Sequence, residues 1–183
     1  MAPSGQTTTP DVQALLRDST LAGEWALDTS TSTIGLKSKS MWGLVPVNGV
    51  FREVTGQGTV SAAGEVSGAI SVAAASIDTK MKKRDVHLRS KDFFDSDNFP
   101  AITFAVAQLT PSGAGVTVAG NLTVRDRTQP VSFPAKVSVL GSGEVQLDAA
   151  VPVSRADFGL TWNQMGMASM ANTITVHAVF RKR

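Results

Sequence analysis

The sequence contains no cysteine and no tyrosine, and only two of its 183 residues are histidines. Without cysteine, the chain forms no disulfide bonds and offers no thiolate as a nucleophile or metal ligand. A metal site built from other ligands needs several histidines or clustered carboxylates, and His87 and His177 lie far apart in the chain. We therefore predict neither a metal site nor a cofactor.

Long apolar runs are also absent. No segment approaches the roughly 18 apolar residues that a membrane-spanning helix needs. Residues 1–20 show neither the basic start nor the apolar stretch of a signal peptide. We expect a soluble, cytoplasmic protein, or a periplasmic or secreted one if a signal peptide has been removed.

The chain does contain enough apolar material for one folded domain. Hydrophobic residues make up 42% of it and charged residues 17%, with a net charge of +2, which is too apolar for a disordered protein. We predict a flexible lead with a short helix over residues 1–20 and one domain over residues 21–183. Within the lead, Asp11 is a suitable N-cap for a helix over residues 12–18.

Most of the domain alternates apolar residues with small or polar ones, which is the period of a half-buried β-strand. The alternation is clear at 102–106, 116–124, 131–139, 145–151 and 174–180, and it recurs at 34–36 and 70–74. Turns rich in Gly and Pro separate these segments, and helices do not alternate with them. The pattern indicates an all-β fold, an antiparallel sandwich or closed barrel of about eight strands.

Two interior regions break the alternation. Residues 80–97 are the most charged stretch, and their apolar residues predict a short helix or crossover around residues 80–92 that lies on the barrel. Residues 154–172 carry Trp162 and three methionines between a turn and the last strand. We interpret the second region as an adaptable apolar surface near a rim or as ordinary core.

The best case for catalysis is the group Asp85, His87 and Arg89. Residues two positions apart do not face one another on a helix, so we interpret His87 as a surface or rim residue. No nucleophile elbow, SxxK pair or phosphate-binding loop is present. We predict no catalytic residues and no enzymatic activity.

Basic residues gather between Lys80 and Lys91, but acidic residues interrupt them. Only Phe93 and Phe94 nearby offer rings for base stacking. The run therefore predicts a solvated face and no nucleic-acid partner.

The same region carries a more specific motif. Residues 76–79 read SIDT, residues 84–95 read RDVHLRSKDFFD, and residues 99–104 read FPAITF. The flanks agree, with WALD and Ser32 in the opening segment, VNGVF at 47–51, GNLTV at 120–124 and RADFGL at 155–160. Over about residues 23–181 the sequence resembles the YceI-like family. The resemblance implies an extended eight-stranded, lipocalin-like antiparallel β-barrel whose channel holds a polyisoprenoid or a related long-chain lipid.

Four positions depart from that family pattern. Thr31 and Ser40 stand where the family has histidines, Leu36 replaces a phenylalanine, and Asp126 or a neighbour replaces a glycine. The resemblance implies that the polar positions contact a ligand headgroup. The family resemblance therefore predicts the apolar tail of the ligand better than the identity of its headgroup.

We predict a binding protein that acts as a carrier, store or sensor of a polyisoprenoid or another isoprenoid or fatty-acyl lipid. Its ligand is held by apolar contact with inward-facing side chains. The predicted ligand-binding residues are Leu36, Trp42, Leu44, Phe51, Val72, Phe104, Leu122, Phe133, Leu147, Trp162, Met165, Met167 and Ile174.

Two alternatives remain open at this point. In one, side chains fill the barrel and the methionine and tryptophan region docks a partner. In the other, Asp85, His87 and Arg89 form an enzyme site for a lipid headgroup. A peripheral membrane contact for ligand exchange and a homodimer are the further partners that the sequence leaves open.

Overall fold

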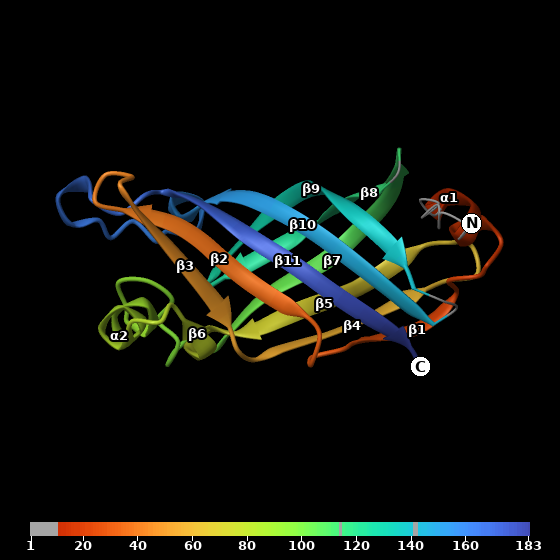
Figure 1. The fold of residues 1–183 in the computed structure, drawn as a ribbon, viewed down its shortest axis with the longest axis horizontal. Helices are drawn as coiled ribbons and strands as arrows, with labels where there is room; N and C mark the ends of the chain where they lie inside the picture. The colour runs from red at the N-terminus through yellow and green to blue at the C-terminus, as the bar shows by residue number, and fades with distance from the viewer. Residues whose placement is uncertain (1–10, 114, 141–142) are drawn as a thin grey trace, which may run out of the picture.

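The computed structural model describes residues 11–113, 115–140 and 143–183. The predicted flexible lead at residues 1–9 lies outside the described residues. The helices are α1 Val12–Arg17 and α2 Lys82–Arg89, with short 3₁₀ segments η1 Ala74–Ser76, η2 Arg155–Phe158 and η3 Gln164–Gly166. The strands in Figure 1 are β1 Gly23–Leu27, β2 Thr33–Ser40, β3 Val45–Phe51, β4 Val54–Val60, β5 Val66–Ala73, β6 Ile77–Asp78, β7 Ala101–Ser112, β8 Gly115–Val124, β9 Arg127–Val139, β10 Glu144–Ser154 and β11 Ala171–Lys182.

These strands form one antiparallel sheet that closes on itself, because β1 pairs with β4 on one side and with β11 on the other. The ring order is β1-β4-β5-β7-β8-β9-β10-β11, which is eight strands. The other three strands lengthen this ring at one end: β2 follows β1 along β11, β3 pairs with β2, and β6 pairs with β3. The described chain thus forms the predicted extended, closed, eight-stranded antiparallel barrel and not a sandwich.

The first long strand of the barrel is bent between β1 and β2. At the bend, the Asp28 carboxylate accepts hydrogen bonds from the Ser30 hydroxyl at 2.6 Å and from Arg181 Nε at 2.7 Å. The buried Ser32 hydroxyl accepts a hydrogen bond from the backbone N–H of Val179 at 2.9 Å. Both halves of the bent strand are therefore attached to β11.

Strands β9 and β10 pair over only part of their length, from Val139 opposite Val145 to Lys136 opposite Asp148. Alternate residues of a strand direct their backbone groups to opposite neighbours. Because β9 is fully paired with β8, Pro130 and Pro134 must turn their nitrogens toward β10. Proline has no N–H to donate, which explains why the β9–β10 ladder ends where it does.

Buried side chains form two clusters, one toward each end of the barrel. The first includes Leu27, Phe51 and Phe94, and the second includes Leu16 and Val116. Phe104, Leu147 and Phe180 contact both clusters without being fully buried. The middle of the barrel is therefore less tightly filled than its ends.

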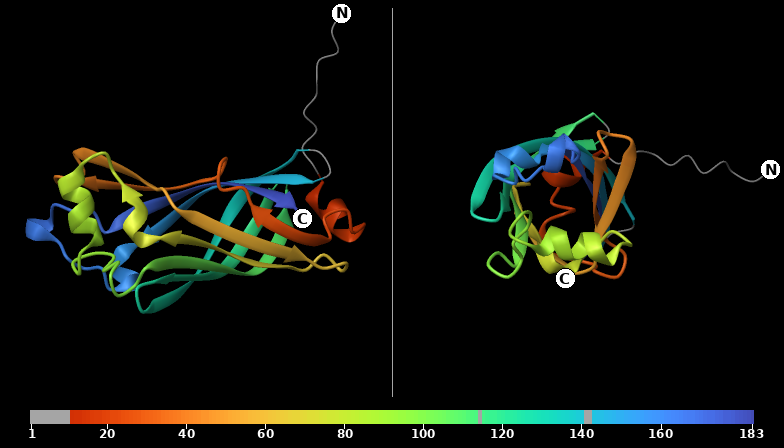
Figure 2. Two further views of the ribbon diagram at one scale, coloured as in Figure 1. Left: turned by 90° about the horizontal axis from the view of Figure 1, so that it is seen from below. Right: turned by 90° about the vertical axis from the view of Figure 1, so that its left-hand side faces the viewer.

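Different elements lie at the two ends (Figures 1 and 2). Helix α1 lies at one end, and α2, the β2–β3 hairpin tip and the η2–η3 segment lie at the other. Asp11 caps α1 by accepting a hydrogen bond from Ala14 N at 3.1 Å. Helix α1 ends at Arg17, one residue before the predicted end. Helix α2 confirms the predicted helical crossover.

Candidate ligand-binding cavity

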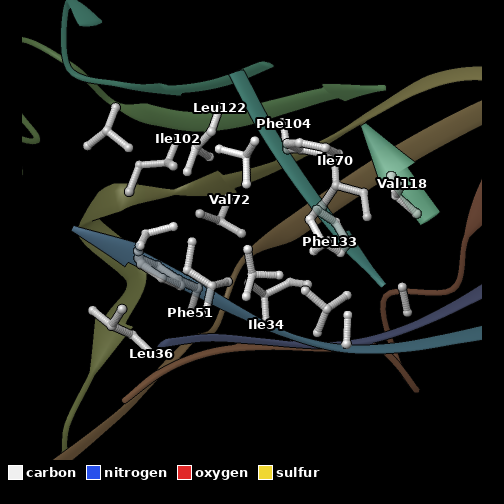
Figure 3. Close-up of a pocket in the computed structure, with 18 of the residues that line it drawn as sticks. Ile34, Leu36, Phe51, Ile70, Val72, Ile102, Phe104, Val118, Leu122 and Phe133 are labelled. Atoms are coloured by element: carbon white, nitrogen blue, oxygen red, sulfur yellow. The ribbon is translucent and has the colours of Figure 1, made fainter. Parts of the chain in front are cut away.

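A cavity of about 470 Å³ runs inside the barrel from α1 to the opposite end. Figure 3 shows that Leu36, Ile70, Phe104 and Phe133, from four different strands, point into this common space. Roughly 300–1,000 Å³ is typical of sites for small organic ligands. The cavity is thus large enough to hold part or all of one such molecule.

The inward-facing side chains are incompletely buried, although they point to the centre of the barrel. Ile102, Phe104, Phe133 and Ile174 are all half-buried and all line the cavity. A well-packed core leaves few voids larger than a water molecule. The alternative of a barrel filled by its own side chains is therefore wrong.

The structure places most of the predicted ligand-binding residues around this cavity. Those that line it are Leu36, Phe51, Val72, Phe104, Leu122, Phe133, Leu147, Trp162 and Ile174. All except Trp162 lie on strands, where the alternation of side chains decides which face a residue occupies. The structure brings these residues together from both halves of the chain.

Trp42, Leu44, Met165 and Met167 do not line the cavity, so their prediction as lining residues is wrong. Trp42 and Leu44 lie in the β2–β3 tip and are exposed, and Met165 is exposed in η3. Met167 is half-buried next to η3. Strand alternation says nothing about loop residues, and their apolar character alone suggested an inward position.

A β-bulge in β7 changes which residues face the cavity. The pairing of β7 with β8 shifts between Val106 and Gln108. Phe104 and Val106 line the cavity before the shift, and Leu109 lines it after the shift. An inserted residue reverses the strand alternation, and this reversal is not visible in the sequence pattern.

Helix α1 closes one end of the cavity, which we call the closed end. Val12, Leu16 and Leu21 line the cavity there and are buried against Trp25 and Val116. Trp25 Nε1 donates to the carbonyl of Leu21 at 2.9 Å. Val12 and Leu16 lie in α1 and Leu21 follows it, and none of the three is among the predicted ligand-binding residues.

At the opposite end the exposed Lys39 lines the cavity, and we call this end the open end. It supplies the charged side chains of the cavity wall. The charged or titratable residues that line the cavity are Lys39, Arg84, His87 and Arg155, and no Asp or Glu lines it among the described residues. Arg84 donates to the hydroxyl and carbonyl oxygens of Thr79 at 2.7 and 2.8 Å. The open end of the cavity is therefore cationic.

Three rings pack together at the open end. The His87 ring lies edge-on to Trp162, with 4.4 Å between ring centroids, and 5.1 Å from the Phe93 ring. Phe93 and Trp162 are 5.4 Å apart. His87 Nε2 is 2.8 Å from a carboxylate oxygen of Asp92, which orients the imidazole. These aromatic rings bring the α2 region and the η2–η3 segment together.

Arg155 holds the η2–η3 segment in place. Its guanidinium is buried and donates to the carbonyl oxygens of Leu160, Trp162, Ala168 and Ser169 at 2.6–3.1 Å. Burial disfavours the charged form and lowers the pKa of this guanidinium from its usual value. The four carbonyls supply the partners that a buried cation requires.

Asp85, His87 and Arg89 do not form a common site. Asp85 accepts hydrogen bonds from the backbone N–H and hydroxyl of Thr79, while Arg89 donates to the carbonyl of Ala75 at 3.3 Å. His87 alone of the three lines the cavity. The structure therefore provides no arrangement of these residues around one reacting atom.

The two polar positions at which the sequence departs from the family pattern are separated in space. Ser40 lines the cavity near the open end, whereas Thr31 is exposed in the turn between β1 and β2. Only Ser40 is placed to contact a ligand inside the cavity.

In residues 11–113, 115–140 and 143–183, His, Asp and Glu side chains form no group of three that is suited to hold a metal ion. Within the same ranges, neither helix has the length and apolar character needed to cross a bilayer.

The fold and its cavity define a hollow antiparallel β-barrel of the kind that encloses an apolar ligand. The chain belongs to the YceI-like domain family, whose model matches residues 25–181. The family resemblance found in the sequence is confirmed.

Curated relatives and solved structures agree with this assignment. A UPF0312 protein of Enterobacter sp. (strain 638) is 31% identical over 132 residues, which are 66% of each chain. UPF0312 protein YE1254 of Yersinia enterocolitica is 34% identical over 99 residues, and the match spans about half of its length, 51%.

Two solved structures share the fold. Burkholderia cenocepacia BcnA has a TM-score of 0.76 and 25% identity, covering 84% of this chain and 98% of BcnA. A polyisoprenoid binding domain from Saccharophagus degradans has a TM-score of 0.71 and 15% identity, covering 87% and 98%. At that identity the second similarity shows the fold alone.

Proposed function

We propose that the protein binds one long-chain apolar ligand, a polyisoprenoid or a fatty-acyl lipid, in the barrel cavity and acts as its carrier, store or sensor. The observation that carries the proposal is the cavity itself, whose strand-borne walls are almost entirely apolar. Each 100 Å² of apolar ligand surface removed from water there contributes about 2.5 kcal/mol. The name of the Saccharophagus degradans domain supports the isoprenoid class.

The polarity of the cavity wall suggests how such a ligand lies. Val12, Leu16 and Leu21 form an apolar floor at the closed end. Lys39, Arg84 and Arg155 lie at the open end. We therefore place the ligand tail toward α1 and any polar headgroup among the basic residues.

The direct test is native mass spectrometry of the purified protein, followed by organic extraction and identification of what is released. We expect one long-chain isoprenoid or acyl compound per protein, or uptake of one when candidate lipids are offered. A protein that carries no lipid and takes up none would contradict the proposal.

A matched pair of variants on β9 sharpens this test. Phe133 points into the cavity, where its ring lies 5.5 Å from that of Phe104, whereas the next residue, Ser132, is exposed. We expect Phe133→Asp to weaken lipid retention about a hundredfold or more, because a carboxylate is costly to place against an apolar chain. Ser132→Asp should retain lipid as the unaltered protein does.

Folding of the variants is checked by circular dichroism, and Phe104→Asp provides a second charged substitution in the same cavity. Full lipid content in a folded Phe133→Asp or Phe104→Asp protein would show that the ligand does not lie in the cavity.

A further inference from the structure

Large apolar side chains project into solvent at the open end. Trp42, Leu44 and Met165 are 62%, 81% and 78% exposed, and Met41 is 44% exposed. They belong to two adjacent loops, the β2–β3 tip and η3, which Figure 1 places at the end that also carries α2. We call these four residues the apolar tip. Clustered exposed apolar side chains are typical of surfaces that contact a partner.

The backbone adopts an unfavourable conformation to present them. Met41, Trp42 and Met165 have φ values of 52°, 55° and 54°, in the left-handed region. Asn and Gly are the usual residues at such hairpin positions, because bulky side chains are strained there. Large apolar residues at strained, exposed positions indicate a use for these side chains outside the folded core.

Hydrogen bonds hold the two loops of the apolar tip together. Trp42 donates from Nε1 to the carbonyl of Met165 and from its backbone N–H to the carbonyl of Met167, each at 3.2 Å. The backbone N–H of Ser169 donates to the carbonyl of Lys39 at 3.0 Å. The tip is therefore a defined surface rather than two independent loops.

The apolar tip continues the rim of the cavity. Lys39 and Ser40, immediately before Met41, line the cavity, and Ala168 and Ser169, just after η3, line it from the other loop. An apolar molecule that enters or leaves through the open end passes beside the tip.

Basic residues surround the same end. Residues 80–92 contain six Lys or Arg and two Asp, a net charge of +4, which exceeds the +2 of the whole chain. Lys82 and Lys83 on α2 are exposed, and Met81 and Val86 beside them are exposed apolar side chains. A tryptophan-bearing apolar surface flanked by lysines is suited to the interface of a bilayer with anionic headgroups.

We propose that the apolar tip and the basic face of α2 dock the open end onto the surface of an anionic lipid bilayer. A second copy of the chain is a poorer partner, because a stable interface uses about 20–30 residues on each side and the tip has four. The purpose of docking rests on the proposed function, since docking brings the cavity to a membrane that supplies or accepts its lipid. Vesicle binding itself is measured without any ligand in the cavity.

The test is co-sedimentation of the full chain with phosphatidylcholine vesicles and with vesicles that also contain phosphatidylglycerol. We expect binding to the phosphatidylglycerol vesicles only, and weaker binding at high salt because ions screen surface charge. Leu44→Asp should lower the partition coefficient about tenfold or more, because it replaces a leucine buried in lipid by a charge. Lys82→Glu should lower it at least about fivefold, since each basic residue near such a surface contributes about that factor.

Leu140→Asp is the matched control. Leu140 is 49% exposed, and it follows Val139, the last residue of β9, which packs against the buried cluster of the closed end. We expect this variant to bind vesicles like the unaltered protein. Tryptophan fluorescence should shift to the blue on addition of phosphatidylglycerol vesicles. Trp42→Phe should remove most of the shift, because Trp25 is buried and Trp162 packs against His87 and Phe93 on the cavity wall.

Equal vesicle binding by Leu44→Asp and Leu140→Asp, equal binding to both kinds of vesicle, or a dimer in solution that Leu44→Asp dissociates would each overturn the proposal. Lipid retention is measured in parallel. If the unaltered protein retains lipid but does not bind the phosphatidylglycerol vesicles, this inference alone is refuted. If the unaltered protein neither retains nor takes up lipid, the proposed function is refuted.

Discussion

The two ends of the barrel each contain a cluster of buried apolar side chains, and they differ in their buried polar groups. At the closed end, Val12, Leu16 and Leu21 bury apolar surface against the barrel wall. At the open end, the buried Arg155 guanidinium binds four carbonyls and Asp85 binds Thr79. Apolar contact is non-directional, whereas hydrogen bonds fix groups at set distances and angles. Apolar packing of α1 therefore seals one end of the barrel, and hydrogen bonds of buried polar groups hold the loops at the other end.

The largest effect on stability is expected at the open end. Arg155→Met should lower the free energy of unfolding by about 3 kcal/mol, because it leaves several buried carbonyls without donors. Arg155→Lys should not recover the lost free energy of unfolding, since lysine lacks the planar set of donors of arginine. Denaturant unfolding measures both changes.

Arg52→Met is the control for this comparison, because Arg52 forms an exposed ion pair with Asp78 at 2.9 Å. Exposed pairs contribute about 0–1 kcal/mol. If Arg155→Met lowers the free energy of unfolding no more than Arg52→Met does, the hydrogen bonds of Arg155 do not stabilise the open end.

At the closed end, Leu16→Ala should lower the free energy of unfolding by about 2 kcal/mol, because a buried leucine is truncated. Gln13→Ala, on the exposed side of α1, should change it little. The same denaturant titrations are used. Similar stabilities of the two variants would show that α1 does not pack firmly on the barrel.

The smallest effect lies between the ends, at the bend between β1 and β2. Hydrogen bonds from Ser30 and Arg181 hold the pKa of the Asp28 carboxyl well below its ordinary range. A lowered folded-state pKa stabilises the fold above the unfolded value of about 3.9, and this contribution is lost as the pH falls toward the folded-state pKa. Asp28→Asn should therefore lower the Tm slightly at neutral pH. The difference in Tm between this variant and the unaltered protein should be smaller at about pH 3. An equal difference at both pH values would contradict this assignment.

The predictability of the cavity depended on where each residue lies. Phe133 and Leu147 were correctly predicted to line the barrel interior, because strand alternation is a local property of the backbone. Strand alternation cannot place Leu109 on the cavity wall, because the bulge after Val106 reverses that alternation. Trp42 and Leu44 were wrongly placed inside, because a hairpin tip has no periodic pattern to follow.

The sequence alone indicated an all-β fold of about eight strands, the crossover helix, α1 and the family, because these depend on residue periods, capping residues and local motifs. Only the tertiary structure decided that the barrel is hollow, which end is closed and where β9 and β10 separate. Those properties depend on pairings between distant segments, such as β1 with β11, which set the width of the barrel relative to the bulk of its side chains.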